Sequence, residues 1–370
     1  MIRKGKHWLK VRCITKESAR LVDSFQGKLG RLIKTKRLPP GMAIAIMANL
    51  NFHGRDMPTS VFNNLNYNAG FETADDPIVL GEAFKRISGR KVKIDKTARM
   101  KIGDFLLQYN FVRGYRPRRQ ARKADIPLNL PFEPKKFNYA VKECDPEKFA
   151  SSKYDSNLSI DFLFNRYPFA PYHFLWVPNR KTGQHNQYLS PNEDAAIIEA
   201  AWSFVVAEGL GEAIRLCYNS NGAHASVNHL HLQGFFLTNE WEPPIERLIR
   251  NHDGSSGPLS CHFCGARWIS KSDGVKGLKD FIGEMNGRYF KYKEKIAYHF
   301  CMTPHGIACF PRKHQGDEKY FALLQEAAFT TGYAFFEMLG EIISPTADVS
   351  LFNQDKTLRQ IEDLYAVLCI

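Results

Sequence analysis

The chain lacks any run of about 20 apolar residues, which is the length that a membrane-spanning helix needs. Its longest apolar stretch, from Pro40 to Leu50, is short and continues into polar and charged residues. The N-terminus is basic, but further Lys and Arg follow it where a signal peptide would have an apolar run. We therefore expect a cytoplasmic protein that has no membrane association.

Cysteine is scarce as well, with 8 among 370 residues, and only Cys261 and Cys264 stand close together. This usage does not indicate the disulfide scaffold of a small secreted protein. At 44% hydrophobic and 13% aromatic residues, the chain is too apolar to be disordered. Its length allows a large core, in two or three domain-sized units or in one large fold with a repeat.

Acidic residues are outnumbered, because 38 Asp and Glu face 51 Lys and Arg, for a net charge of +13. The excess gathers in residues 1–40 and in a second cluster that contains no acid, formed by Arg113, Arg116, Arg118, Arg119, Arg122 and Lys123. Such a surface attracts polyanions, although a solvated face has the same composition. Tyr115 is the only aromatic within the second cluster, whereas arginine-rich RNA-binding segments often interleave aromatics for stacking. Nucleic acid therefore stays open as a partner but is not favoured.

The N-terminal region offers weak secondary-structure signals. We expect a short buried strand at Met42–Met47, a helix over Lys96–Tyr109 and an extended connector over Pro117–Pro134. From residue 137 onward the signals sharpen. The expected strands are 173–177, 213–218, 230–237, 296–303 and 307–311, and the expected helices are 190–207, 317–339 and one within 350–370. The order of strand, proline and helix occurs twice, at 173–207 and at 296–339, which indicates a duplicated core.

Two histidines and a glutamine alternate with leucines in the segment His229-Leu-His-Leu-Gln233. In a strand, this alternation places His229, His231 and Gln233 on one face and both leucines on the other. The preceding loop, Asn219–Asn228, is rich in Asn, Ser and Gly, which suits phosphate binding. A neutral imidazole there can attack phosphorus directly. The alternatives are a polar strand that satisfies its own hydrogen bonds and a metal site.

The segment from Asn219 to Gln233 closely resembles the active-site signature of the GDP-hexose phosphorylases, which act on GDP-L-galactose and GDP-D-glucose. This group is a branch of the histidine triad superfamily, beside galactose-1-phosphate uridylyltransferase and the Ap4A phosphorylases. Residues 111–138 and 168–178 are similar to the group too, although Tyr172 stands where these enzymes have the glycine of a Gly-His pair. The resemblance covers about residues 105–320.

The resemblance implies an α+β fold in which a histidine-triad-like, mainly antiparallel sheet is built from two related halves with packed helices. It divides the chain into a basic region of unassigned structure at 1–105, a first half with the active-site loop at 106–245, and a second half with C-terminal helices at 246–370.

The activity implied by the resemblance is cleavage of a GDP-hexose by inorganic phosphate into GDP and hexose 1-phosphate, through GMP bound covalently to His231. Gln233 would bind the phosphate and His229 would shape the same face. The implied substrate-binding residues are Asn219, Asn221, Ser226, Asn228, His173 and Arg312. Ap4A phosphorolysis and hexose-1-phosphate uridylyl transfer are alternatives on the same fold. A basic nucleic-acid-binding protein that acts on nucleotide ends is an alternative of another class.

Cys261 and Cys264 have the spacing of half a zinc site. The remaining candidate ligands are His252, His299, Cys301, His305 and Cys309. They include no second compact pair. The resemblance implies no required cofactor, so a zinc ion at this site would be structural. His224 either contacts the ligand or is an ordinary loop residue. A homodimer, the base and the sugar stay open.

Overall fold

The structure is a computed structural model, and it describes residues 8–12, 15–69, 75–115, 126–183, 185–207, 210–261, 263, 265–327, 329–344 and 354–370. Within these residues, no helix has both the length and the apolar character needed to cross a membrane.

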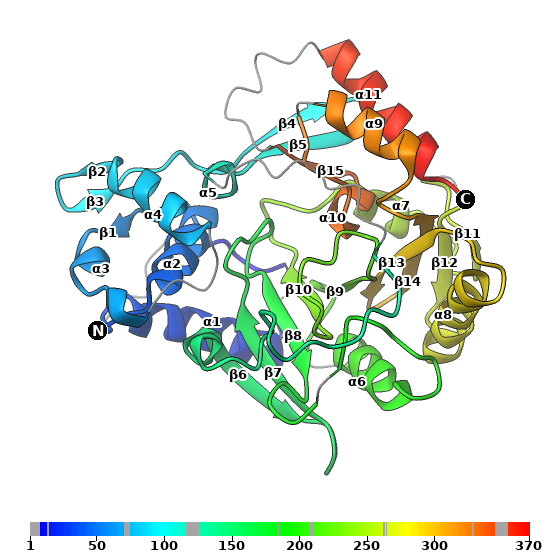
Figure 1. Ribbon diagram of the computed structural model, residues 1–370, viewed down its shortest axis with the longest axis horizontal. Coiled ribbons are helices and arrows are strands. Elements are labelled where there is room, and N and C mark those ends of the chain that lie inside the picture. The colour runs from blue at the N-terminus through cyan, green and yellow to red at the C-terminus, as the bar shows by residue number, and fades with distance from the viewer. Residues whose placement is uncertain are drawn as a thin grey trace.

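A sheet of nine strands forms the centre of the protein, in the order β11-β12-β14-β13-β9-β10-β8-β7-β6, and all its neighbouring strands are antiparallel (Figure 1). The strands are β6 (Lys148–Lys153), β7 (Ser159–Phe164), β8 (Phe174–Pro178), β9 (Ile214–Asn219), β10 (Leu232–Phe236), β11 (Gly257–Pro258), β12 (Arg267–Ser270), β13 (Ile296–Thr303) and β14 (Gly306–Lys313).

The sheet consists of two related halves. The first follows the order β8, α6 (Ala195–Val206), β9 and β10, and the second follows the order β12, α8 (Gly274–Phe290), β13 and β14. In each half the strand before the helix pairs with the last strand. The halves meet where β13 pairs with β9, with His299 opposite Asn219. The predicted fold class, a mainly antiparallel sheet from two related halves with packed helices, is confirmed, but the repeat begins at β12 instead of at residue 296.

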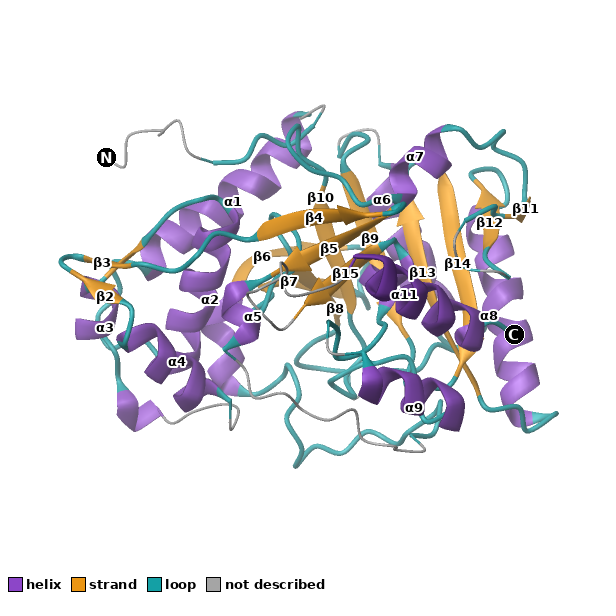
Figure 2. Cartoon of the chain, turned by 90° about the horizontal axis from the view of Figure 1, so that it is seen from above, coloured by secondary structure: helices purple, strands orange, loops and turns teal. Residues whose placement is uncertain are grey.

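Helices cover the two faces of the sheet differently (Figure 2). On one face, Phe204 of α6 packs on Phe162 and Phe281 of α8 packs on Tyr298. Helix α1 (Lys16–Leu32) packs on the outer strands of the first half. The opposite face is contacted by α10 (Phe335–Met338) at β9 and β13, and we call it the α10 face.

Two expectations in the N-terminal region are wrong. Residues 42–47 lie in helix α2 (Pro40–Phe52), in which all residues are buried. A helix that is buried all round has no apolar stripe, so its sequence does not show the helical period. Lys96–Tyr109 forms a hairpin of β4 (Ala98–Ile102) and β5 (Phe105–Tyr109), because Gly103 adopts a φ of 57° in the turn. Strand β5 also pairs in parallel with β15 (Glu341–Ser344).

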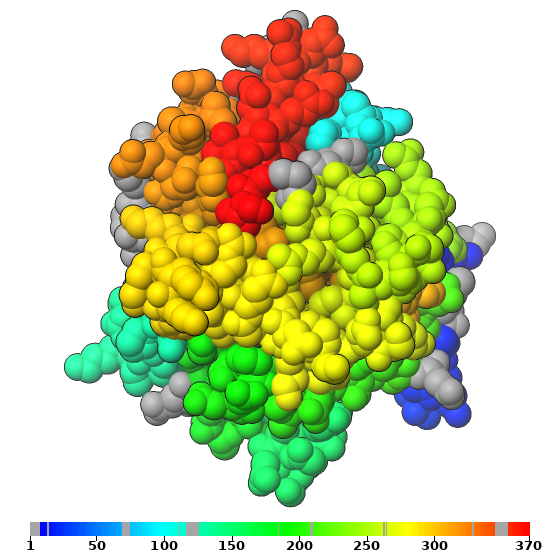
Figure 3. All heavy atoms as spheres, turned by 90° about the vertical axis from the view of Figure 1, so that its right-hand side faces the viewer, coloured from blue at the N-terminus to red at the C-terminus, as the bar shows by residue number. Residues whose placement is uncertain are grey.

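The five strands expected after residue 137 form as β8, β9, β10, β13 and β14, and two of the expected helices differ in extent. Strands β6, β7, β11 and β12 and helix α8 have no counterpart among the expected elements. Helix α6 begins at Ala195, after a turn in which the Glu193 N–H donates to Ser190 Oγ and the Asp194 carboxylate accepts from the Ser190 N–H. The helix expected from 317 to 339 ends at Glu326 (α9, Glu318–Glu326). The C-terminal helix α11 (Gln354–Leu368) lies against α9 (Figure 3).

The remaining elements are short and lie mostly in the N-terminal region. They are β1 (Met57–Pro58), α3 (Ser60–Asn63), a 3-10 turn (Tyr67–Ala69), α4 (Asp76–Phe84), β2 (Ile87–Ser88), β3 (Lys91–Val92), α5 (Phe111–Gly114), a second 3-10 turn (Lys142–Glu147) and α7 (Ile245–Arg250).

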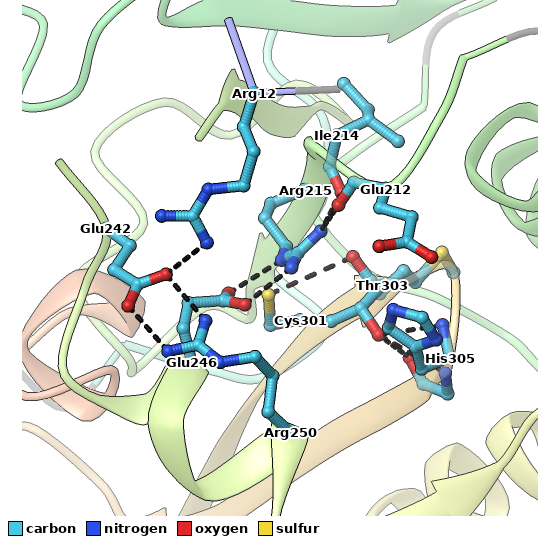
Figure 4. Close-up of polar contacts among 12 residues, drawn as sticks. Arg12, Glu212, Ile214, Arg215, Glu242, Glu246, Arg250, Cys301, Thr303 and His305 are labelled. Carbon is cyan, nitrogen blue, oxygen red and sulfur yellow. Dashed lines mark hydrogen bonds and ion pairs between the residues drawn. The ribbon is translucent and has the colours of Figure 1, made fainter. Parts of the chain in front are cut away.

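Ion pairs fasten the N-terminal segment to the first half of the sheet. Glu242 lies between Arg12 and Arg250 and accepts a hydrogen bond of 2.6 Å from each (Figure 4). Beside them, Arg215 of β9 and Glu246 of α7 form a buried two-point pair at 2.7 and 2.5 Å. The Arg12 N–H also donates to the Leu237 carbonyl, immediately after β10. These contacts join residues from three distant parts of the sequence.

Candidate active site

His231 is held in one tautomer just before β10. Its Nδ1 lies 2.8 Å from the carbonyl oxygen of His229, which can only accept, so Nδ1 carries the proton. Nε2 therefore bears a lone pair. Burial lowers the pKa of His231 to about 4, so the ring is neutral at pH 7. A neutral imidazole with a free Nε2 is suited to attack an electrophilic centre.

The backbone of His231 is fixed by Gln187, a residue that the sequence analysis did not select. Gln187 Oε1 accepts from the His231 N–H at 2.9 Å, and its Nε2 donates to the carbonyls of Asn219 at 2.8 Å and His231 at 3.1 Å. One buried side chain thus ties the end of β9 to the start of β10. Gln187 belongs to no motif, and it lies 44 positions from His231.

We expect Gln187→Glu to lower the free energy of unfolding by about 3 kcal/mol, because a carboxylate cannot donate to two buried carbonyls. The shape of the side chain and the acceptor for the His231 N–H both persist. Urea unfolding measures the loss. The matched substitution Gln354→Glu, on the exposed side of α11, should change stability by less than about 0.5 kcal/mol. Equal effects of the two substitutions would contradict this role of Gln187.

His173 and Gln233 form a hydrogen-bonded pair on the α10 face. The Phe169 N–H donates to His173 Nδ1, so Nε2 carries the proton and donates to Gln233 Oε1 at 3.0 Å. Burial, followed by the nearby Arg113 charge, lowers the pKa of His173 to about 3. With its oxygen engaged, Gln233 makes no other hydrogen bond to a described residue through its NH2 group, which is left to donate to a ligand.

Tyr172 has a left-handed backbone, with φ of 52°, at the position where the similar enzymes carry glycine. This conformation is strained for a residue with a Cβ. The N-terminal region holds it in place. The Tyr172 hydroxyl donates to the Leu9 carbonyl at 2.7 Å and accepts from Gln26 at 2.9 Å, and its ring packs against Phe25 at 5.6 Å. The departure from glycine is thus accommodated by contacts with residues that precede the sheet.

His229 has a buried N–H that lacks a partner among the described residues. The Tyr139 N–H donates to Nδ1 at 3.1 Å, which places the proton on Nε2, and this atom makes no hydrogen bond within the part of the chain that the structure describes. Burial, followed by the charge of His231, lowers the pKa of His229 to about 4. The Tyr139 ring lies 5.8 Å from the His229 ring and 5.0 Å from the His231 ring. An unpaired buried donor beside a free imidazole nitrogen indicates a place for an acceptor atom of a ligand.

The expected strand covers only part of this motif, because β10 begins at Leu232 and includes Gln233 alone among the three polar residues. All four residues from 229 to 232 are buried, but their neighbours alternate. Leu230 and Leu232 pack in the hydrophobic core, while His229 and His231 both contact Tyr139.

Asn219, at the end of β9, lies next to the same region. Its Oδ1 accepts from His299 Nδ1 at 2.7 Å and from the Phe335 N–H at 3.0 Å. Burial, followed by the charge of Arg312, lowers the pKa of His299 well below its ordinary value. Arg312 is itself fully buried and donates to the Tyr333 and Lys313 carbonyls. The predicted cation is therefore in the interior, in contact with His299, and not at the protein surface.

The other polar residues of the loop mostly bind protein. Asn221 Nδ2 donates to the Leu128 carbonyl at 3.3 Å, and Asn228 Nδ2 donates to the carbonyls of Leu130 and Pro131. Both amides thus fasten the loop to the connector that ends at Pro134. Ser226 is exposed.

Two further loop residues face the second half. Gly222 has a φ of 78°, and a Cβ there would lie 2.1 Å from His314 Cδ2, so only glycine fits. His224 bonds to the Tyr320 hydroxyl at 2.8 Å. The alternative in which His224 is a loop residue bound by protein is therefore the one that the contacts favour.

Of the second basic cluster, the structure describes Arg113, whose guanidinium lies 5.4 Å from the Phe169 ring centroid and donates to the Tyr167 carbonyl. The other members of this cluster, at 116–123, lie outside the described residues, as does Cys264. The Cys261 thiol donates to the Phe263 carbonyl, and burial raises its pKa to about 11. Among the residues that the structure describes, no three His, Cys, Asp or Glu side chains are arranged to hold a metal ion. The zinc prediction stays a prediction.

Three solved structures similar to this protein share low sequence identity with it. Yeast Ap4A phosphorylase Apa2 in complex with Ap4A is 14% identical, with 80% of this chain and 95% of that chain covered and a TM-score of 0.47. An ADP-glucose phosphorylase from Arabidopsis thaliana is also 14% identical, with coverages of 72% and 98% and a TM-score of 0.31. A galT-like protein from Arabidopsis thaliana is 13% identical, with coverages of 75% and 100% and a TM-score of 0.29.

No curated protein matches the chain. A family model does match, and it is described as the GDPGP1-like, N-terminal domain, over residues 100–235. This range contains β8, β9 and all but the last residue of β10, together with His173, Gln187, Asn219 and the segment from His229 to Gln233. It lies within the part of the chain in which the sequence resembles the GDP-hexose phosphorylases, apart from its first few residues. Residues 100–235 of this chain are thus similar to the N-terminal domain of the GDPGP1-like family.

Proposed function

We propose that this protein is a nucleotidyltransferase of the phosphorylase type, which cleaves a GDP-hexose with inorganic phosphate to give GDP and hexose 1-phosphate. The reaction proceeds through GMP bound covalently to His231. The observation that carries the proposal is the His231 ring, whose Nδ1–H is bound to the His229 carbonyl while the neutral ring keeps its Nε2 lone pair. The GDPGP1-like match over this segment supports the choice of a GDP-hexose.

In the first step, His231 Nε2 attacks the α-phosphorus of the GDP-hexose. A P–N bond forms, and the bond from that phosphorus to the oxygen bridging the two phosphates breaks. Hexose 1-phosphate leaves with the electron pair. A phosphate monoester leaves readily as an anion because its second pKa is about 6, so this step needs no general acid. The imidazole becomes positively charged, and the His229 carbonyl that accepts from Nδ1–H stabilises this charge.

In the second step, an oxygen of inorganic phosphate attacks the same phosphorus. The P–N bond breaks, GDP is released and His231 recovers its lone pair. Both steps spread negative charge over the phosphoryl oxygens, so they need oriented donors instead of a strong base. The NH2 groups of Gln233 and Asn219 and the unpaired N–H of His229 serve as these donors.

The other predicted residues take supporting roles in this scheme. His173 orients Gln233, while Asn221 and Asn228 fix the loop that carries the exposed Ser226. Each of these assignments is part of the proposal.

Steady-state assays with purified protein test the proposed reaction. GDP-glucose, GDP-mannose, GDP-galactose, ADP-glucose, UDP-glucose and Ap4A are each incubated with inorganic phosphate, and the nucleoside diphosphate and sugar phosphate are quantified. We expect GDP and hexose 1-phosphate to form in equal amounts, with parallel double-reciprocal lines when phosphate is varied at several GDP-hexose concentrations.

Each alternative gives a different result in this assay. Turnover of Ap4A or UDP-glucose alone would overturn the GDP-hexose assignment and keep the histidine mechanism. If no donor turned over and the protein instead bound duplex or single-stranded nucleic acid with a steep salt dependence, the phosphorylase proposal would fail in favour of a nucleic-acid function.

A further inference from the structure

Two amide side chains flank His231, and the oxygen of each is engaged by a buried histidine. Gln233 lies two residues after His231 and its Oε1 accepts from His173. Asn219 lies on the adjacent strand, and Gln187 bridges its carbonyl to that of His231. Its Oδ1 accepts from His299. The two pairs therefore approach His231 from different directions, one along β10 and one across from β9.

The orientation of the Asn219 amide is settled by its partners. The Phe335 N–H donates to Oδ1, so this atom is the amide oxygen and Nδ2 points away from both partners. Asn219 Nδ2 makes no hydrogen bond to a described residue. It is also not fully buried, unlike the occluded polar atoms that lack a partner among these residues. Its NH2 group is thus left as a donor beside His231.

The tautomer of His299 is fixed in turn by Arg312. The Arg312 Nη1 group donates toward His299 Nε2 at 3.4 Å, so that nitrogen is the acceptor and Nδ1 carries the proton that reaches Asn219. A guanidinium is always a donor, so this contact permits one tautomer only. The fixed charge of Arg312 also opposes protonation of the ring.

We propose that His299 and Arg312, which come from the second half of the sheet, are positioning residues that orient the Asn219 NH2 group toward the phosphoryl oxygens reacting at His231. His299 thus plays for Asn219 the part that His173 plays for Gln233. The second half completes an active site whose reacting residue lies in the first half. This inference rests on the proposed phosphorylase function, because it assigns roles within that reaction.

Two substitutions of nearly equal size separate orientation from packing. His299→Asn places an N–H donor near the position of Nδ1, so the Asn219 oxygen stays engaged and its NH2 still faces the substrate. His299→Asp can only accept, so its carboxylate repels the Asn219 oxygen. The Phe335 N–H still binds that oxygen and opposes a full rotation of the amide, so the NH2 group is displaced from its orientation toward the phosphate. The Arg312 guanidinium lies next to position 299, and its positive charge offsets the cost of burying the aspartate.

The readout is the rate at which GMP adds to His231 when the protein is mixed with GDP-hexose without phosphate, in a single turnover. We expect the rate to stay within about 3-fold for His299→Asn and to fall about 100-fold for His299→Asp, the effect of losing one preorganised donor. The loss should appear in the rate at saturating GDP-hexose. Equal rates for the two variants, with both folded by circular dichroism, would overturn the proposal.

A double-mutant cycle tests whether the effect passes through Asn219. In an Asn219→Ala background the Asn and Asp variants at position 299 should react at the same rate, because no amide remains to be turned. If the 100-fold difference persisted in that background, the aspartate would be acting by direct repulsion and His299 would have no positioning role.

The outcomes also separate this inference from the proposed function. If the unsubstituted protein forms no adduct with any nucleotide donor, the phosphorylase proposal fails and takes the inference with it. If the unsubstituted protein forms the GMP adduct and the two variants behave alike, only the role of His299 and Arg312 fails.

Discussion

Replacing His231 with asparagine is expected to abolish turnover of the GDP-hexose, with a loss of at least roughly 10,000-fold. Asparagine keeps an N–H near the position of Nδ1, so the bond to the His229 carbonyl persists while the nucleophilic Nε2 is lost. We expect His231→Asn and His231→Ala to be equally inactive, and the asparagine variant to retain more of the native stability.

Steady-state GDP release measures the activity of both variants, and thermal unfolding measures their folding. His305→Ala is the control, because His305 lies in the turn between β13 and β14 and outside the site. It should leave both readouts unchanged. Near-normal turnover by either His231 variant would show that another residue carries the nucleophile.

Acid is expected to unfold this protein over a narrow range, between about pH 6 and pH 4.5. Six histidines, of which five are buried and His224 is partly buried, have a pKa far below the 6.5 of an exposed imidazole. The pKa is about 3 or 4 in five cases and well below 6.5 for His299, and the six are His53, His173, His224, His229, His231 and His299. Below pH 6.5 the unfolded chain binds protons that the folded protein does not accept until about pH 4. The free energy of unfolding therefore falls as pH falls through this window.

Two buried carboxyl groups act in the opposite direction. Burial raises the pKa of Glu147 to about 8 and that of Glu337 to about 7, so the folded protein holds these protons where the unfolded chain releases them. Six histidines against two carboxyls leave a difference of about four protons near pH 5. At about 1.4 kcal/mol per proton and pH unit, the slope is about 5.6 kcal/mol per pH unit, against a total stability of about 5–15 kcal/mol.

Urea unfolding at pH 7.5, 6.5 and 5.5 measures this slope. His53→Gln is a matched variant, because its amide oxygen can still accept from the Leu9 N–H that now bonds to His53 Nδ1. It should lower the slope by the contribution of one proton, about 1.4 kcal/mol per pH unit. Stability that stays level between pH 6.5 and 5.5 would show that these histidines are not held neutral in the folded state.

Five of the nine strands of the sheet, β8, β9, β10, β13 and β14, could be predicted from the sequence because they are bounded by clear local signals. Val177 and Pro178 end β8 as expected, and the Pro304-His305-Gly306 turn separates β13 from β14. The sequence of α2 resembles a buried strand because every one of its residues is buried, which removes the helical period. In the β4–β5 hairpin, apolar residues happen to lie at helical spacing, which predicts a helix although Gly103 favours a turn.

The candidate site likewise contains residues that the sequence predicts and residues that it does not. His229, His231 and Gln233 share one short motif, so the sequence alone predicts them. Gln187 and His299 reach the site only through the sheet, since His299 lies 80 positions from the Asn219 that it contacts. From the sequence, His299 is a candidate zinc ligand only. Single-sequence patterns report neighbours along the chain, whereas these contacts depend on the register of β9 with β13.

The N-terminal region, for which the sequence suggested no role, contacts the site through Tyr172. The residue before His173 keeps its strained backbone while Gln26 and Leu9 hold its hydroxyl. His173 in turn fixes Gln233. The region thus supports the geometry of the α10 face from outside the sheet.

The most direct test of the central claim is the intact mass of the protein after mixing with GDP-hexose in the absence of phosphate. The account predicts a mass increase equal to GMP, located on the peptide that contains His231, and its disappearance with release of GDP when phosphate is added. The His231→Asn variant should show no increase. Turnover of GDP-hexose without any such adduct, or an adduct on a different residue, would contradict the covalent mechanism at His231.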